Sequence, residues 1–496
     1  MSGTDGGGTI RSGALGALGL GVVLSAALVV VLDFSIVNVA LPDISRELHI
    51  SSSSVQWVVT AYAITFGGFL VLGGRAADLF GRRRIFVGGL IGFAIASAAG
   101  GVAADFPLLV ISRAVQGMAA AAVAPAALSI LTTSFHGTVR TRVLGYYGAT
   151  ASVGFVLGLV LGGILVQSAG WRAVFFVNVP ICLLCAALGR RIRSDATTTG
   201  TRRRLDLFGA CLVTAGMATL VYAPTAGVDD GWSSVPFVAA LTISVVLLTA
   251  FVVHERRTTE PLVPLTIFRS RTLAAGDAVT LLLGAWNAGE VLLLSLYLQH
   301  VLGYSPLLTG LAVVPQGVAG LVRGAVGASL VARLGIKRFL VASVVIAAVG
   351  LGLLLRFPST SRYPLLGVVL FVVGFGTTSA AFGATVAGSS DVNDDDQGLA
   401  GALINAARQI GAALGVATLL SVAAAQSPSR SPAGLAAGYR TAMGVAAVLA
   451  LAAGAISVAF VHDRACRRQQ QRLRERRLDQ PWPLPELLAD RQITHG

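Results

Sequence analysis

The stretch VVLDFSIVNVALPDI, residues 30–44, lies in an apolar run that extends from about Ala14 to Leu41. At a rise of about 1.5 Å per residue, a helix of this length crosses a hydrocarbon core of about 30 Å. Asp33 stands inside the run, where an ionised side chain is costly unless it is paired, protonated or hydrated. The stretch therefore predicts a membrane-spanning helix that carries a functional acid.

Similar apolar runs recur along the whole chain of 496 residues, 55% of which are hydrophobic and 12% charged. The mean hydropathy of +0.78 is typical of an integral membrane protein. Strand-like alternation is absent, so we expect an all-α membrane protein rather than a barrel. The first run is too long for a cleaved signal peptide and shows no clear small-residue cleavage site before Asp33.

Fourteen candidate spans are separated by charged or Pro/Gly-rich breaks. They lie near residues 15–41, 55–77, 84–104, 107–133, 142–168, 173–190, 205–225, 235–254, 272–301, 306–331, 338–356, 364–387, 399–424 and 438–461. If the N-terminus is cytoplasmic, the loops that follow even-numbered spans are cytoplasmic, and these loops are the basic ones. We therefore expect a multi-pass protein of the cell (plasma) membrane with both termini in the cytoplasm.

The spans group into a duplicated bundle with an inserted pair. Residues 1–194 are expected to form an N-terminal six-helix bundle, 205–254 two additional linker helices, 272–461 a C-terminal six-helix bundle and 462–496 a basic cytoplasmic tail. Repeated bundles of this kind usually enclose a substrate cavity near the midplane and move by rocking around it.

The formal net charge of +14 is explained by basic cytoplasmic flanks. A nucleic-acid partner would find its best support in the arginine-rich tail from Arg464 to Arg477, but a positive-inside flank that contacts membrane lipids accounts for the same residues. One cytoplasmic loop, SSDVNDDDQG, is acidic; we favour a solvated loop there over a cation site.

Between the second and third spans stands GGRAADLFGRRRIF, residues 73–86. Its glycines allow a tight turn and its arginines anchor the loop in the cytoplasm, which a plain basic loop would also do. The stretch resembles the signature loop of the major facilitator superfamily, written G-x-L-A-D-R-x-G-R-R. The matching positions are Gly74, Asp78, Gly81, Arg82 and Arg83. The chain departs at Leu79, where the family commonly has Arg, and at Ala332, where the second half lacks the acid.

The fourth span contains LLVISRAVQGMAAA, with Arg113, Gln116 and Gly117. Arg113 is flanked by apolar residues on both sides, so exposure to lipid would be expensive and we expect it to point inward. The R-x-x-Q-G pattern resembles the second motif of the superfamily, whose arginine is associated with proton coupling in exporters.

The fifth span reads GFVLGLVLGGILV and carries glycines at helical spacing. Small residues at every fourth position let two helices approach closely, and packing alone would explain them. The arrangement is similar to the antiporter motif of the superfamily, although Leu159 stands where that motif has proline. The glycines concerned are Gly154, Gly158, Gly162 and Gly163.

Six further stretches narrow the resemblance. LDFSIVNVALPDI, WRAVFFVNVP, LDLFG, EPLVPLTIFRSRT, YLQHVLGYSPLLTGLAVVP and INAARQIGAALGVA all look like the fourteen-span drug:proton antiporters, the EmrB/QacA-like multidrug resistance transporters. The resemblance covers residues 14 to about 460. It implies a major facilitator fold and proton-coupled efflux (drug:H⁺ antiport) of a small lipophilic drug or antibiotic. It also implies a monomer that uses the proton gradient as its energy source and needs no cofactor.

Asp33, Arg113 and Gln116 are the candidate proton-coupling residues. Burial disfavours the charged form of a carboxylate and a neighbouring guanidinium favours it, so Asp33 is expected to take up and release protons. Protonation and substrate binding would then compete. A structural Asp33–Arg113 pair without titration is the alternative.

The second candidate acid is Glu290, in the ninth span. Trp286, Asn287, Glu290 and Tyr297 share one side of the predicted helix and would suit a lipophilic cation, unless the aromatic residues are placed there by chance. Asp277, nearer the start of the same span, is expected to pair with Arg269 or Arg271.

Two arginines lie within later spans. Arg323 in the tenth span, if it faces the cavity, would disfavour a cation and suit an anionic or neutral natural product. Arg408 is expected to fix the position of the thirteenth span. The charge of the substrate stays open.

Other function classes find little support. A solute importer or metabolite carrier of the same fold is the alternative, favoured if the missing proline at Leu159 matters. Against an enzyme, the six histidines are scattered, and no metal-ligand spacing, nucleophile elbow or phosphate loop is found. Cys182 and Cys185 form a C-x-x-C inside an apolar helix, where ordinary packing is favoured over a metal site.

Overall fold

The computed structural model describes residues 16–135, 137–192, 206–259, 261–355, 363–389, 397–427, 429 and 431–461. All regular elements in these ranges are helices, which confirms the predicted all-α fold. The acidic stretch around Asp394 and the basic tail 462–496 lie outside the described residues.

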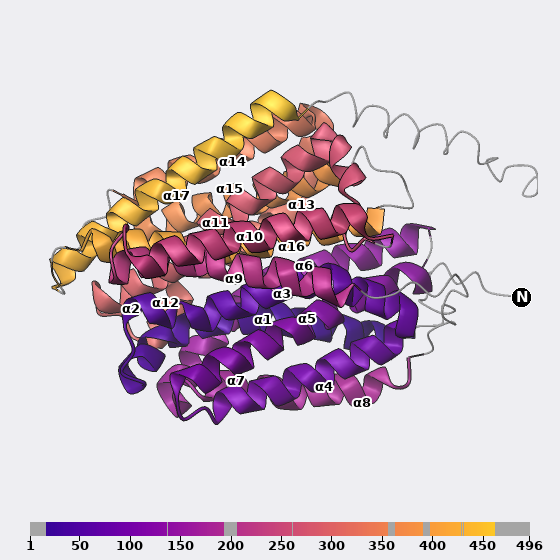
Figure 1. The fold of residues 1–496 in the computed structure, drawn as a ribbon, viewed down its shortest axis with the longest axis horizontal. Helices are drawn as coiled ribbons and strands as arrows, with labels where there is room; N and C mark the ends of the chain where they lie inside the picture. The colour runs from indigo at the N-terminus through magenta and orange to yellow at the C-terminus, as the bar shows by residue number, and fades with distance from the viewer. Residues whose placement is uncertain are drawn as a thin grey trace, which may run out of the picture.

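The first half of the chain forms a bundle coloured indigo to purple in Figure 1. Its helices are α1 (Ala17–Glu47), α2 (Ser52–Val55), α3 (Trp57–Phe80), α4 (Arg82–Gly101), α5 (Phe106–Ser134), α6 (Gly137–Ala169), α7 (Ala173–Phe176) and α8 (Asn178–Gly189).

The remainder contains an inserted hairpin and a second bundle, coloured from magenta to yellow. The hairpin is α9 (Leu207–Asp229) and α10 (Val235–Arg257), followed by the 3₁₀ turn η1 (Leu265–Arg269). The second bundle consists of α11 (Arg271–His300), α12 (Pro306–Ala312), α13 (Val314–Leu334), α14 (Ile336–Leu354), α15 (Tyr363–Ser389), α16 (Gln397–Ala425) and α17 (Pro432–Phe460).

The described residues include 13 helices that are long and apolar enough to cross a membrane, by length and composition. The segment Ala173–Gly189, which matches the sixth predicted span, is apolar but shorter than these. It is divided into α7 and α8 at Val177. The chain is therefore a multi-pass membrane protein, with one of the fourteen expected spans shorter than the rest.

Several boundaries differ from the sequence prediction. The span expected at 306–331 is two helices, and Pro315, which has no N–H to donate, lies in the first turn of the second. α1 continues past Leu41 to Glu47. α17 begins at Pro432 rather than near residue 438, because the Ser431 side chain caps it by accepting a hydrogen bond from the backbone N–H of Gly434 at 3.2 Å.

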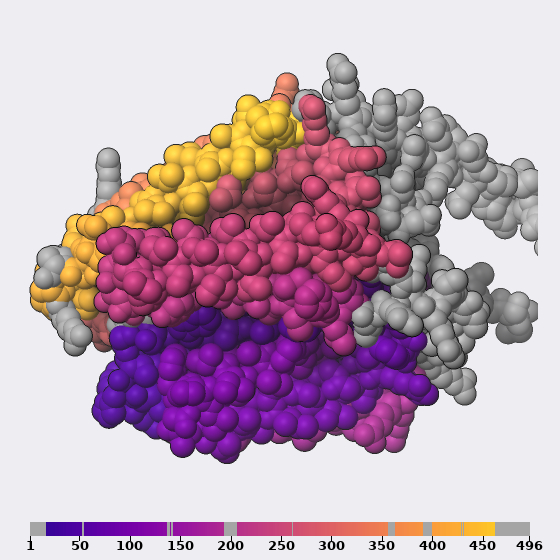
Figure 2. All heavy atoms as spheres, viewed as in Figure 1, coloured from indigo at the N-terminus to yellow at the C-terminus, as the bar shows by residue number. Residues whose placement is uncertain are grey.

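The inserted hairpin covers the seam between the two bundles. α9 packs against α3 of the first bundle and α16 of the second. Figure 2 shows α9 and α10 as a magenta ridge between the purple and the yellow parts of the surface. The buried Gln56 side chain donates to Thr225 Oγ1 of α9 at 2.7 Å, which ties the hairpin to the start of α3. α10 is mostly unburied within the protein, as expected of a lipid-facing helix.

The bundles also meet along three pairs of helices and at one end of the molecule. α3 packs against α16, and α6 packs against α12 and α13. We call the end at which α1 begins the near end and the opposite end the far end. Toward the far end, Ser295 Oγ donates to the carbonyl of Asn38 at 3.1 Å, and Gln299 Nε2 donates to the carbonyl of Val39 at 3.3 Å. These bonds join α11 of the second bundle to α1 of the first.

Candidate proton-coupling and substrate site

Asp33 lies at the centre of a fully buried hydrogen-bond network inside the first bundle. Arg113 Nη1 donates to Asp33 Oδ2 at 2.7 Å, and neither side chain is exposed. Gln116 Nε2 donates to Asp33 Oδ1 at 2.8 Å, and Arg113 Nη1 also donates to Gln116 Oε1 at 2.6 Å. The structure thus brings together all three residues expected from the sequence to couple protons.

The guanidinium of Arg113 is held by further groups from α3 and α7. Its Nε donates to the carbonyl of Val58 at 2.8 Å. The centre of the guanidinium lies 4.5 Å from the ring centroid of Tyr62 and 5.9 Å from that of Phe175. Aromatic faces attract a cation most strongly where water is excluded. The side chain therefore points into the bundle, as expected, and its placement is fixed from several sides.

Two members of the network were missed in the sequence. Asn178, the first residue of α8, donates from Nδ2 to Asp33 Oδ1 at 2.7 Å. Ser97 of α4 accepts from Gln116 Nε2 and from Asn178 Nδ2, each at 3.3 Å, and donates to the carbonyl of Phe175 at 2.8 Å. The sequence signal for Asn178 is the stretch WRAVFFVNVP, whose resemblance to the drug:proton antiporters does not by itself give Asn178 a partner.

Asp33 and Arg113 depend on each other as buried charges. Asp33 accepts three hydrogen bonds, one of them from a cation, so both of its oxygens are satisfied as a carboxylate. Removing one partner of a buried ion pair typically costs about 3–5 kcal/mol, because the other charge stays buried and unpaired. A proton on Asp33 would have the same effect on Arg113, since it cancels the charge that holds the guanidinium.

Gly117, which completes the R-x-x-Q-G pattern, is required by packing. A Cβ at this position would lie 3.1 Å from the backbone nitrogen of Phe66 and closer still to the carbonyl of Tyr62. Only glycine lets α5 approach the backbone of α3 so closely. This approach brings Arg113, one turn before Gly117, within reach of the Val58 carbonyl.

The glycines of α6 form a ladder against α1, the helix that carries Asp33. A Cβ on Gly154 would lie 3.0 Å from the carbonyl oxygen of Leu28, one on Gly158 would lie 2.7 Å from that of Leu32, and one on Gly162 would lie 2.9 Å from that of Ile36. Each step is four residues on both helices, as expected for small residues at a close helix crossing.

The fourth glycine of this helix has a different neighbour. A Cβ on Gly163 would lie 2.6 Å from the Cα atom of Leu307 in α12 of the second bundle. Leu159 is buried, and the Cβ of an alanine at Gly310 of α12 would lie 2.9 Å from its carbonyl carbon. α6 therefore contacts both Asp33's helix and the opposite bundle, in addition to the direct bonds between α1 and α11, and it runs without a break from Gly137 to Ala169.

The loop motif forms the turn from α3 to α4. Gly81 has φ +96°, a backbone conformation that residues with a side chain rarely adopt. Gly335, between α13 and α14, likewise has a positive φ of +78°. Asp78 and Arg82 form an exposed ion pair at 3.6 Å. Arg83 donates to the carbonyl of Arg190, 3.3 Å away, and so binds the end of α8.

Gly74 makes looser contacts than its neighbour. A Cβ on Gly74 would lie 3.6 Å from the Cβ of Pro125, an ordinary contact, whereas one on Gly73 would lie 2.7 Å from the carbonyl carbon of Ala121. The tight approach of α3 to α5 is therefore at Gly73, which is not among the matching positions of the signature loop.

The second bundle contains a separate buried acid, Glu290 of α11. Gln316 Nε2 of α13 donates to Glu290 Oε2 at 2.9 Å. Trp286, one turn earlier, is fully buried and donates from Nε1 to Thr377 Oγ1 of α15 at 3.2 Å. Asn287 is half-buried. Glu290 and Trp286 thus share one side of α11, as predicted, but both lie inside the bundle.

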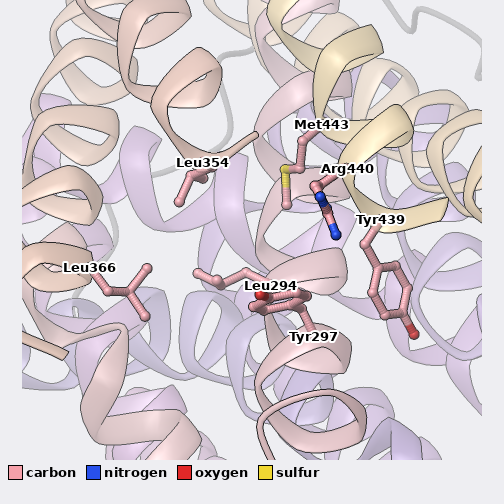
Figure 3. A pocket seen from close by; sticks show the side chains of 7 residues that line it. All are labelled: Leu294, Tyr297, Leu354, Leu366, Tyr439, Arg440 and Met443. Carbon is pink, nitrogen blue, oxygen red and sulfur yellow. The ribbon is translucent and has the colours of Figure 1, made fainter. Parts of the chain in front are cut away.

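Tyr297 faces a different space, a pocket at the far end of the second bundle (Figure 3). Its ring meets that of Tyr439 edge to face, with 6.3 Å between centroids. About 370 Å³ of space, part of it open to solvent, lies within the pocket, and Arg440 of α17 contributes the cation among its lining residues. Tyr297 is two helical turns from Glu290, so the structure separates it from the Trp286–Glu290 pair.

The remaining charged residues of the second bundle stand apart from this pair. Arg323 is half-buried and stacks on Phe382, with 5.3 Å from the guanidinium carbon to the ring centroid. Within the described residues Asp277 forms no ion pair with Arg269 or Arg271, and its buried Oδ1 has no hydrogen-bond partner, so that expected pairing is wrong. Arg408 has an exposed side chain that donates to Asn405 Oδ1 at 2.9 Å.

Among the described residues, no group of three or more His, Cys, Asp and Glu side chains is arranged to hold a metal ion. Cys182 and Cys185 are unbonded and buried in the apolar core of the first bundle.

Comparison with known proteins identifies the family. Residues 23–416 match the model of the Major Facilitator Superfamily. The chain is 41% identical to the puromycin resistance protein pur8 of Streptomyces alboniger over 82% of this chain and 81% of that protein. It is 38% identical to the cephamycin export protein CmcT of Amycolatopsis lactamdurans over 86% and 89% respectively.

A solved structure shows the same fold at low sequence identity. The crystal structure of a bacterial homologue of the human lysosomal transporter Spinster matches with a TM-score of 0.66 and 14% identity, over 88% of this chain and 95% of that chain. The match over most of the sequence, together with the paired helical bundles, places the chain in the Major Facilitator Superfamily.

Proposed function

We propose that the protein exports small lipophilic antibiotics or drugs from the cytoplasm in exchange for protons. Two relatives that align over most of the chain are named for puromycin resistance and cephamycin export. The proposal treats the proton gradient as the energy source, with no cofactor, and the chain as a transporter rather than an enzyme. We further propose that it acts as a monomer.

The distribution of basic residues supports cytoplasmic termini. At the near end, each of the loops after α3, α8, α10 and α13 is flanked by arginines, among them Arg82, Arg190, Arg257 and Arg333. Basic residues in short loops favour the cytoplasmic side. We therefore propose that the near end faces the cytoplasm and the far end the outside.

The observation that carries proton coupling is the Asp33 network, in which both carboxylate oxygens accept hydrogen bonds. As a carboxylate, Asp33 holds Arg113 by a bond of 2.7 Å and also accepts from Gln116 and Asn178. As a carboxylic acid it would lose the charge attraction to Arg113, and its proton would need an acceptor. The unpartnered Asn178 Oδ1 could serve after rotation of the amide group. Protonation of Asp33 therefore changes the contacts that join α1, α5 and α8, and such a change can favour one state of a two-state carrier over the other.

The position of α1 offers a way to transmit this change. Its backbone is in contact with α6 along the glycine ladder, and Gly163 and Leu159 of α6 contact α12 of the second bundle. A shift of α1 is thereby transferred to the interface that must rock during transport. The proton, taken up from outside, would be released to the cytoplasm after the substrate has left.

The test is puromycin transport by purified protein in liposomes across an imposed pH gradient, with the membrane potential clamped. We expect accumulation on the acidic side for the wild type and its loss in Asp33→Asn. Protein-free liposomes measure passive trapping of puromycin, and Asp43→Asn, at an exposed pair near the far end, is the matched control. Accumulation that ignores the gradient in all forms would reject proton-coupled export.

A further inference from the structure

Glu290 is a buried acid that the Asp33 network does not use. Its side chain is fully buried in the middle of α11. Oε2 accepts one hydrogen bond, from Gln316 Nε2 at 2.9 Å, and the buried Oε1 has no hydrogen-bond partner. In contrast to Asp33, this carboxyl group has one neutral donor instead of three donors that include a guanidinium.

The charged side chains of the neighbouring helices do not compensate Glu290. On α11 and on the α-helices that contact it, the other titratable or charged residues are Asp33, Asp43, Arg46, Glu47, Arg271, Asp277, Tyr297, His300, Arg323, Arg333, Tyr363, Arg408, Tyr439 and Arg440. Asp33 is ion-paired with Arg113. Among the described residues, no cationic side chain lies within ion-pair distance of Glu290. An isolated buried carboxylate is strongly disfavoured and takes up a proton instead.

Gln316 is suited to hold either form of this acid. A side-chain amide can donate from its nitrogen to a carboxylate or to the carbonyl oxygen of a carboxylic acid. After rotation by half a turn, its oxygen can accept from the hydroxyl group of the acid. Gln316 Oε1 has no hydrogen-bond partner in this conformation, so the rotation breaks no hydrogen bond of that oxygen.

The position of Gln316 is itself set by a close approach of two helices. A Cβ on Gly374 of α15 would lie 2.8 Å from the Cα and Cγ atoms of Gln316, so only glycine leaves room for it.

We propose that Glu290 is a second proton-binding site, uncharged in this conformation, and that Gln316 holds it in both protonation states. The proposal rests on the proposed proton-coupled export. It gives each bundle one acid on its first spanning helix, Asp33 on α1 and Glu290 on α11. Each acid takes up a proton from outside and releases it to the cytoplasm once per transport cycle, so the carrier exchanges two protons for each substrate molecule.

The first test is infrared difference spectroscopy of the protein in lipid, perfused between acidic and alkaline buffer. A protonated carboxyl group absorbs in a carbonyl region that carboxylates and amides do not share. We expect a pH-dependent carbonyl band that is absent in Glu290→Gln and retained in Glu255→Gln, a buried acid near the end of α10. A wild-type spectrum that Glu290→Gln leaves unchanged would overturn the proposal.

The second test counts protons and separates this proposal from the proposed function. At zero membrane potential, a gradient of one pH unit supports roughly tenfold accumulation for each exchanged proton. Wild-type protein should therefore accumulate puromycin about tenfold further than Glu290→Gln at equilibrium. Equal accumulation would overturn the second site while leaving export intact. Absence of wild-type accumulation, with the carbonyl band present, would reject export but not the protonation of Glu290. A Glu290→Gln variant that no longer binds puromycin would assign Glu290 to substrate binding and also overturn the proposal.

Discussion

Separating Asp33 from Arg113 should cost more stability than any exposed ion pair of the protein. Both side chains are fully buried, and 2.7 Å separates the paired atoms. Asp33→Asn leaves the Arg113 guanidinium buried without its counter-charge. Arg113→Met leaves the Asp33 carboxylate buried without its counter-charge. Each change should lower the free energy of unfolding by about 3–5 kcal/mol. The double variant removes both charges and should lose less than the sum, by at least about 2 kcal/mol.

The assay is reversible unfolding in mixed micelles as the fraction of denaturing detergent rises, followed by circular dichroism. The Arg46–Asp43 pair, with 2.8 Å between paired atoms and Arg46 75% exposed, is the matched control. Its single variants should change the unfolding free energy by about 0–1 kcal/mol. Additive losses in the Asp33 and Arg113 variants, or single losses as small as those of the control pair, would refute the conclusion that this pair is strongly coupled.

Three further variants test the packing that supports the site. Gly158→Leu should destabilise the fold by about 1–3 kcal/mol or force α6 away from α1, because its Cβ would lie 2.7 Å from the Leu32 carbonyl oxygen. The control Gly148→Leu has open space around it and should not destabilise the fold. Thermal unfolding measures both effects. Gly81→Ala, at φ +96°, should cost about 1 kcal/mol or more by the same measurement, whereas Gly88→Ala should be neutral or stabilising. Gln56→Leu should cost about 1–3 kcal/mol, because Thr225 then loses its buried donor, and faster proteolysis of the α9–α10 hairpin would report the loss.

Charge inside apolar helices was the strongest guide to the site. Asp33 and Arg113 could be predicted because ionisable residues in a spanning helix need partners, and the structure pairs them. Asn178 and Ser97 could not, because neutral polar residues occur in spanning helices without a required partner. Only the tertiary fold, which sets α4 and α8 beside α1, brings them to the carboxylate.

Helical periodicity predicted correctly which residues share a side of α11, but not which of them line the same site along the helix. Trp286, Glu290 and Tyr297 do share a side of α11, but Trp286 and Glu290 are buried while Tyr297 lines a separate pocket, because seven residues span about 10 Å along a helix. The break at Val313 before α13 follows from Pro315, a local signal that the search for long apolar runs overlooked. The expected pairing of Asp277 failed because an arginine close in sequence can still point elsewhere.

The most direct test of proton-coupled export reverses the driving force. A puromycin gradient is imposed across liposomes that contain the purified protein, with no initial pH gradient and the membrane potential clamped, and the internal pH is followed with a trapped dye. The account predicts proton movement opposite to puromycin in the wild type, beyond that of protein-free liposomes, and none beyond it in Asp33→Asn. Puromycin movement through the wild-type protein without any accompanying proton movement would contradict it.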